Sequence, residues 1–244
     1  MVLAIIAILA GLLLPVLATS KTKALGVTCA SNIRQLSLAG NQYADENLNR
    51  LVNNHGKPQT KAERNTWANN VQDWGTSDDN TNTAYLTGGL LGPYTGRAYK
   101  VFKCPADVAR ADNGDRIRSM SMNSQVGDPG ELTNRFNPTY LQFYKTLEMP
   151  NPAGTFVFLD EHPDTLNDGF FMNLLDNEAW GNLPASYHNG AGNFSFADGH
   201  FETHRWLVAG TIRPPSRGAV GGIIAAAPAD DYNWVKARTS SKKP

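Results

Sequence analysis

Residues 1 to 18 contain no charged side chain, and the cations Lys21 and Lys23 follow shortly after them. As an α-helix this run is about 27 Å long, close to the hydrocarbon thickness of a bilayer. The pattern predicts a membrane-spanning helical segment over residues 1–24. A cleaved secretory signal is the alternative, but such a signal needs a charged region before the apolar run, and none precedes this one.

Beyond this run the spacing of apolar residues changes to that of an amphipathic helix. They recur three and four positions apart, with polar residues between them, at Ile33, Leu36, Gly40 and Tyr43. We expect residues 25–46 to continue the first segment as one helix, kinked at Pro15. This helix would be about 70 Å long. A domain of this size cannot bury it, so its first half must pack into lipid or against other subunits.

Strand patterns occur later in the chain. Residues 155–159 are β-branched and aromatic, lie between Gly154 and Asp160, and predict a central strand. Residues 193–197 and 200–206 predict a hairpin whose Asp198-Gly199 pair forms a type I′ turn. Because successive side chains of a strand point to opposite faces, we expect one face of this hairpin to be buried and the other to be wet, that is, exposed to solvent. A further strand is predicted from about residue 99 until Pro105 ends it.

These patterns predict an α+β protein with one globular domain. The 14 prolines and 22 glycines favour short strands and loops over a helical bundle. Residues 47–82 are mostly polar and predict a long loop region with Trp67 and Trp74 as its main apolar anchors. The predicted globular domain spans residues 47–207, and residues 208–244 are predicted to be a C-terminal tail.

Charge and motifs exclude several classes of function. The 22 basic residues balance the 22 acidic ones, and no basic stripe with interleaved aromatic residues occurs, so nucleic acid is not an expected partner. No nucleophile elbow, zinc-protease motif, P-loop or dinucleotide-binding glycine pattern occurs, so we expect no enzymatic activity.

The two cysteines, Cys29 and Cys104, fit no zinc-binding spacing. They would form a disulfide if the domain folds in an oxidising compartment, and two reduced, buried thiols are the alternative.

Acidic residues and histidines suggest candidate metal ligands. The segment with Asp160, Glu161, Asp164 and Asp168 offers several oxygen ligands from one loop, as calcium requires, although it does not match an EF-hand. His188 and Asp198 would lie about 16 Å apart at the two ends of a strand, so they are not expected to share a metal. A turn-forming aspartate and a hydrogen-bonded histidine are the favoured interpretation.

Several ordered segments resemble bacterial type IV pilin-like proteins, in particular the major pseudopilin of type II secretion, with a C-terminal H-x9-D-G signature. The signature residues here are His188, Asp198 and Gly199. The matching segments, in chain order, are AIIAILAGLLLPVLA, CASNIRQLSLAGNQYADEN, LLGPY, FKCPAD, RSMSMN, TFVFLDEHPDTLNDG and YHNGAGNFSFADGHFETHRW. The family's usual start, a basic leader followed by Gly-Phe-Thr-Leu-Ile-Glu, does not occur in the printed sequence; finding it in frame in the upstream DNA would support the resemblance.

The resemblance implies a pilin-like fold, in which a long N-terminal hydrophobic helix packs on an antiparallel β-sheet. It implies a filament subunit anchored in the bacterial inner membrane before assembly, with its globular domain outside the cytoplasm. Its expected partners are copies of itself, other pseudopilins, membrane lipid and the secretion machinery. Some major pseudopilins bind calcium in a C-terminal loop, which supports the acidic loop only by analogy.

Two alternatives remain open. One is a membrane-tethered extracytoplasmic protein that binds a carbohydrate or a metal through its sheet. The other is a metal-dependent hydrolase that uses His188, His200 and the acidic loop, and it requires these groups to converge within a few ångströms.

Overall fold

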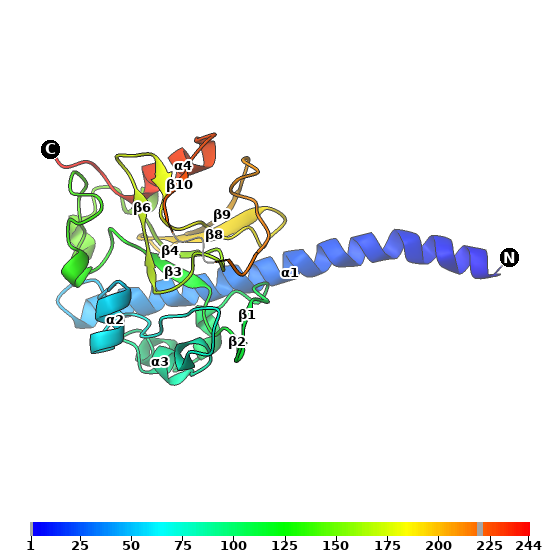
Figure 1. The fold of residues 1–244 in the computed structure, drawn as a ribbon, viewed down its shortest axis with the longest axis horizontal. Helices are drawn as coiled ribbons and strands as arrows, with labels where there is room; N and C mark the ends of the chain where they lie inside the picture. Colours follow the sequence, from blue (N-terminus) through cyan, green and yellow to red (C-terminus); the bar gives the residue numbers. More distant parts are fainter. Residues whose placement is uncertain (1, 219–221) are drawn as a thin grey trace.

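A single long helix dominates the architecture. The computed structural model describes residues 2–218 and 222–244, and for residues 2–8, 10 and 18 it describes the backbone alone. Helix α1 (Val2–Glu46) runs unbroken for 45 residues with Pro15 inside it, as the sequence predicted. Its second half lies against the globular body, whereas its first half extends beyond the body alone (Figure 1). Within the described part of the chain, no helix is long and apolar enough to cross a membrane.

The globular body contains a five-stranded sheet in the order β5-β3-β4-β8-β9. Its strands are β3 (Met120–Asn123), β4 (Phe156–Asp160), β5 (Phe170–Phe171), β8 (Ala191–Phe196) and β9 (Phe201–Arg205). The predicted strand at residues 155–159 is β4, and it is central as expected. All pairings are antiparallel except that of β3 with the edge strand β5, which is parallel. The protein is therefore α+β.

The hairpin of β8 and β9 is present, but its turn differs from the predicted type I′. Gly199 has a φ of +91°, whereas Asp198 is not among the positive-φ residues of the described chain. Backbone bonds run from Gly199 N to Phe196 O and from Phe196 N to His200 O, both 2.9 Å long. This pattern is a three-residue loop with one left-handed glycine. One positive-φ position suffices, and Gly199 supplies it.

The sheet is covered on both faces, so the predicted wet face of the hairpin is wrong for β8. Every residue of β8 is buried. Helix α1 covers one face, and helix α4 (Asp230–Thr239) contributes Tyr232 and Val235 to an aromatic cluster on the other. This cluster also contains Phe156, Phe194, Phe196 and Trp206. Residues 208–244 are thus not simply a tail: they include a helix whose buried side chains complete the core.

Smaller elements surround this sheet. The remaining helices are α2 (Lys57–Glu63) and α3 (Ala84–Thr87), and the remaining strands are β1 (Arg110–Ala111), β2 (Gly114–Asp115), β6 (Asn173–Leu174), β7 (Ala179–Trp180) and β10 (Ile224–Ala225). Where a strand was predicted from residue 99, the chain forms a 3-10 turn, Tyr99–Phe102. Val101 and Phe102 are buried there, so the apolar residues of this segment reach the core without strand pairing.

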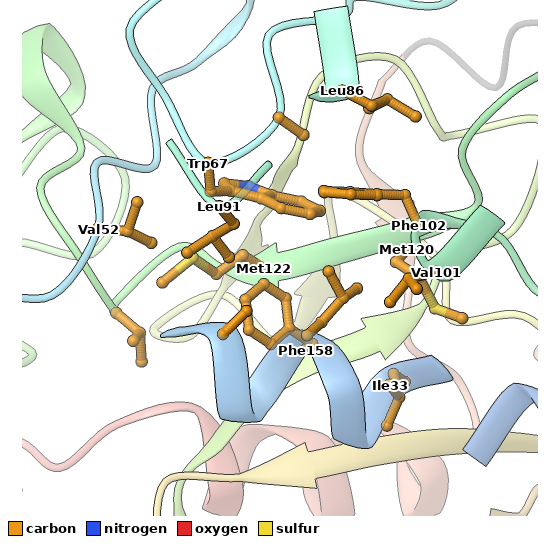
Figure 2. Close-up of a cluster of buried hydrophobic side chains, with 14 of the residues drawn as sticks. Ile33, Val52, Trp67, Leu86, Leu91, Val101, Phe102, Met120, Met122 and Phe158 are labelled. Atoms are coloured by element: carbon orange, nitrogen blue, oxygen red, sulfur yellow. The ribbon is translucent and has the colours of Figure 1, made fainter. Parts of the chain in front are cut away.

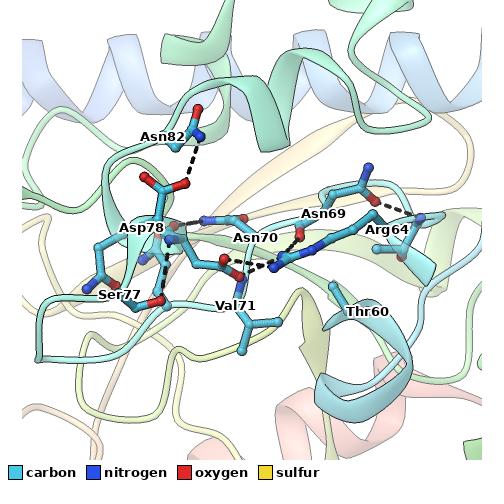
Figure 3. A network of polar contacts seen from close by, with 12 residues as sticks. Thr60, Arg64, Asn69, Asn70, Val71, Ser77, Asp78 and Asn82 are labelled. Atoms are coloured by element: carbon cyan, nitrogen blue, oxygen red, sulfur yellow. Dashed lines mark hydrogen bonds and ion pairs between the residues drawn. The ribbon is translucent and has the colours of Figure 1, made fainter. Parts of the chain in front are cut away.

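The polar region at residues 47–82 is held in place by buried side-chain contacts. Arg64 donates to both carboxylate oxygens of Asp79, and the backbone N–H of Val71 donates to the same carboxylate at 2.7 Å (Figure 3). Arg64 also donates to the carbonyl of Asn69. A side chain that bonds several backbone groups replaces the regular ladder of a helix or strand. These contacts explain how a segment with few apolar residues adopts one conformation.

Trp67 is the apolar centre of that region. Its ring stacks on Phe102 with centroids 5.9 Å apart and meets Phe158 edge-on at 5.2 Å (Figure 2). Its indole N–H donates to the carbonyl of Gly169 at 3.3 Å. Ile33 and Leu36 of α1 belong to the same buried cluster. Trp67 therefore links the loop region, the sheet and the buried half of α1.

Candidate functional site

Four side chains with metal-ligating atoms meet beneath the point where α1 leaves the globular body. Cys29 lies on α1, Cys104 follows the 3-10 turn, Asp160 ends β4, and His188 precedes β8. Their ligand atoms all lie within 4.8 Å of one another. In the described part of the chain, this is the one group of three or more such residues close enough to hold an ion.

The four side chains contact one another directly. The Cys29 thiol donates to the Asp160 carboxylate, with Sγ 3.2 Å from Oδ1 and 3.3 Å from Oδ2. His188 Nε2 lies 3.2 Å from Asp160 Oδ2 and 3.4 Å from Cys104 Sγ. Cys29, Cys104 and Asp160 are at most 1 % exposed. Both thiols are free in the structure, although the sequence suggested that they could pair.

Burial and proximity shift the protonation of these groups. Burial raises the pKa of Cys29, and the neighbouring Cys104 and Asp160 raise it further. Burial also opposes ionisation of Cys104, but hydrogen bonds to Cys29 and His188 bring the pKa of that thiol below its usual value. For His188, burial lowers the pKa, but the hydrogen bonds to Asp160 and Cys104 outweigh it and raise the pKa to about 10. The contacts within the cluster therefore favour the charged forms of Cys104 and His188 although both side chains are largely buried.

The four carboxylates of the predicted calcium loop do not form one site. Asp160 belongs to the cysteine cluster, and Glu161 accepts hydrogen bonds from Ser121, Thr165 and Asn182. Asp164 accepts from the backbone N–H groups of Ser216 and Arg217, and Asp168 accepts from that of Phe170. Each carboxylate already has protein donors of its own, and the four are not gathered within reach of one ion, so the loop does not offer calcium a shared shell of oxygens.

The signature residues have separate roles. His188 belongs to the buried cluster, whereas Asp198 caps the hairpin turn by accepting from the backbone N–H and the ring of His200. The two therefore do not share a metal, as the sequence analysis expected. The hydrolase alternative required His188 and His200 to converge, but His200 stacks on Phe196 at the turn and is not part of the cluster.

The cluster could not be found from the sequence spacing. The separations between contacting residues are 131, 84 and 28 positions, whereas zinc motifs are recognised by ligands a few residues apart. The sequence did single out all four residues, but it left Cys29 and Cys104 open between a disulfide and two buried thiols, and it assigned Asp160 to calcium and His188 to a family signature.

The projecting half of α1 is the second notable feature. Its described leucines and valines are exposed to solvent, with Leu12 at 67 %, Leu14 at 66 % and Leu17 at 61 %. Contiguous apolar surface of this extent on a chain marks a site of association with another apolar surface. The first buried residue of α1, among those whose side chains are described, is Cys29.

Comparison with protein-family models, with curated proteins and with solved structures gave no match for this chain.

The buried carboxylate of Asp168 should make the stability of the folded protein depend on pH. Burial raises the pKa of Asp168 to about 6, although backbone N–H groups of Phe170 and Lys57 and the charge of Arg118 act in the opposite direction. An unfolded aspartate titrates near about 3.9. The folded protein therefore binds this proton more tightly, and the resulting stabilisation is present below about pH 4 and is lost as the pH rises through about 6.

We expect the substitution Asp168→Asn to remove this contribution. The free energy of unfolding of the wild type, minus that of the variant, should fall by roughly 2 to 3 kcal/mol between about pH 4 and pH 7. Urea denaturation at several pH values measures this difference. A difference that stays constant over that range would show that Asp168 has an ordinary pKa in the folded protein.

Proposed function

We propose that this chain is a structural subunit of a type IV pilin-like or pseudopilin filament. In this proposal the projecting half of α1 packs against the same helix of neighbouring copies, while the globular body faces outward. Before assembly, the same segment resides in the inner membrane. The observation that carries the proposal is the apolar half-helix, which extends beyond the body and which no element of the described chain covers (Figure 1).

The energetics favour association of this half-helix. Removal of apolar surface from water contributes roughly 25 cal/mol per Å². The exposed leucines lie on several sides of the helix, because Leu12, Leu13 and Leu14 are consecutive and are 57 to 67 % exposed. Successive helical residues point about 100° apart. A single partner would cover one side only, so a bundle of several helices is the arrangement that buries this surface.

The anchoring of the second half of α1 also supports the proposal. Ile33, Leu36 and Ala39 are almost fully buried in the core, and Tyr94 donates to Glu46 at 2.7 Å near the end of the helix. The projecting half is thus a rigid extension of a helix held by the globular body. Rods held in this way can pack side by side with their bodies in a regular array, as a filament requires.

Cross-linking in the full chain tests the proposal. In cells, Leu13→Cys should form covalent dimers under mild oxidation, because equivalent positions of neighbouring rods come close in a bundle. Val108→Cys serves as the matched control, since Val108 is 84 % exposed on the globular body. Dimers of the Leu13→Cys variant without dimers of the control would support packing through α1.

A second measurement separates assembly from simple residence in lipid. After extraction in mild detergent and removal of the detergent, the full chain should form elongated assemblies that are visible by electron microscopy. A chain that remains monomeric in vesicles and yields no Leu13→Cys dimers would contradict the filament proposal and would favour the tethered binding protein.

A further inference from the structure

We propose that Cys29, Cys104, Asp160 and His188 bind one structural Zn²⁺ ion, which fastens α1 to the globular body. The site lies in the buried region beneath α1, and the proposed filament role neither uses nor requires it. Four ligand side chains from four distant segments converge there. Chance contact among such residues is rare in a core, because thiol, imidazole and carboxylate groups are costly to bury without partners.

The distances fit tetrahedral zinc. Zinc binds sulfur at about 2.3 Å, and nitrogen and oxygen at about 2.0 to 2.2 Å, so neighbouring ligand atoms of a tetrahedron lie about 3.3 to 3.8 Å apart. Three pairs of ligands are already close to this spacing: Cys29 Sγ lies 3.2 and 3.3 Å from the two oxygens of Asp160, and His188 Nε2 lies 3.2 Å from Asp160 Oδ2 and 3.4 Å from Cys104 Sγ. No two of the four ligand atoms are more than 4.8 Å apart, so side-chain movements of about 1 Å bring all four within bonding distance of one ion.

The types of donor atom favour zinc over calcium or magnesium. Two thiols and an imidazole are ligands of zinc, whereas calcium and magnesium take oxygen ligands almost alone. Four protein ligands fill the tetrahedral shell and leave no open position. A closed shell of this kind is typical of structural zinc sites, whereas catalytic sites keep one position for water.

Without an ion, the hydrogen bonding of the cluster is incomplete. His188 Nε2 lies within 3.4 Å of both Cys104 Sγ and Asp160 Oδ2, yet this nitrogen carries one proton at most. It can share that proton between the two neighbours only as a weaker three-centre bond, and Asp160 already accepts from Cys29. An ion at the centre replaces these shared contacts, because each of the four side chains then directs a lone pair toward it.

The ion can reach the cluster from solvent. A cavity of about 420 Å³ opens beside α1, and its lining includes His188, Gly26 and Asn193. Gly26 matters here, because a Cβ at this position would lie 3.4 Å from His188 Nδ1 and would narrow the approach. The histidine is thus the ligand nearest the surface, and the two cysteines and Asp160 lie deeper.

The position of the site suggests its effect. Cys29 is the first buried residue of α1 among those with described side chains, so the ion would bind the helix where it leaves the body. It would join that point to β4 through Asp160 and to the segment before β8 through His188. Zinc binding should therefore stabilise the docking of the helix on the sheet.

Metal analysis of the full chain tests the inference. The protein, purified in detergent micelles without reductant or chelator, should contain about one zinc per chain. When Co²⁺ replaces the zinc, the protein should show the strong visible absorption of a tetrahedral cobalt site and near-ultraviolet bands from its thiolate ligands. Cys104→Ser and His188→Gln should each weaken zinc binding by at least about 100-fold, since even the loss of a supporting contact costs 10- to 100-fold. His200→Gln is the matched control and should bind as the wild type does.

Measurements on the wild-type protein alone test the zinc proposal even if a variant fails to fold. Folded wild-type protein that takes up neither zinc nor cobalt overturns the inference. A Cys29–Cys104 disulfide, detected by mass and by the lack of reactive thiols in the native protein, also overturns it. If the His188→Gln variant retains as much zinc as the His200→Gln control, the bound zinc is adventitious and the inference is wrong. Because all measurements use detergent-solubilised chains, they are independent of whether filaments form.

Discussion

Replacing Leu13 and Leu17 together by aspartate should abolish self-association of the full chain. The two residues are four positions apart and so share one side of the helix, where they are 57 % and 61 % exposed. Burying an unpaired carboxylate in an apolar helix bundle costs at least about 3 kcal/mol, which corresponds to an affinity loss of about 100-fold or more. Sedimentation after detergent removal measures the change.

Leu207→Asp is the control for this experiment. Leu207 is 78 % exposed on the globular body, so the same chemical change there should leave assembly as it is in the wild type. If both variants assemble normally, the projecting helix is not the contact between copies, and the filament proposal loses its basis. If both fail, the outward face of the body also takes part in assembly.

Replacing Trp67 by alanine should have the largest effect on stability. Trp67 is fully buried between Phe102 and Phe158 and bonds the carbonyl of Gly169. Removal of such a side chain leaves a cavity and an unpaired carbonyl, and it should cost about 3 to 5 kcal/mol. Urea denaturation, followed by circular dichroism, measures the loss.

Trp74→Ala is the corresponding control. Trp74 is half-exposed and contacts the guanidinium groups of Arg116 and Arg217 through its ring. Arg217 is exposed but Arg116 is buried, so these cation–π contacts contribute about 0.5 to 2 kcal/mol, and this variant should lose less stability than Trp67→Ala. Equal losses in the two variants would mean that Trp67 is not the centre of the packing between the loop region and the sheet.

The projecting half of α1 and the proposed zinc site lie next to each other along the helix. Most described side chains before Cys29 are exposed and would associate with other copies, whereas Cys29 and, beyond it, Ile33 and Leu36 are buried in the core. A zinc ion at Cys29 would lie at this boundary and would resist forces on the projecting half that tend to peel the helix from the sheet. Chelation should therefore loosen the start of the docked segment first, which hydrogen exchange of the amides around Cys29 can measure.

Local patterns in the sequence predicted some elements well. The spacing of Ile33 and Leu36 indicated one amphipathic continuation of the apolar run, and α1 ends at Glu46 as expected. The run at residues 155–159 indicated the central strand. Both predictions rest on periodicity within a short segment, which the backbone geometry of a helix or a strand directly produces.

Other elements depended on distant contacts and were misread. Tyr232 and Val235 are three positions apart, and Asp230 and Asp231 precede them as acidic residues do at a helix start. This signal was present, but one short apolar stripe does not show which surface it covers. The wet face predicted for β8 failed for the same reason, because α1 covers the side of β8 that carries Asn193, whose amide donates to the carbonyl of Gly26.

The sequence by itself determined that the chain begins with a long helix whose first half is apolar, since charge and periodicity are local properties of consecutive residues. Only the tertiary structure decided that Cys29, Cys104, Asp160 and His188 meet. Their contacts join segments up to 131 positions apart, and side chains so distant become neighbours only through the packing of α1 against β4 and β8. A metal site of this kind is a property of the fold, because no stretch of the chain contains more than one of its ligands.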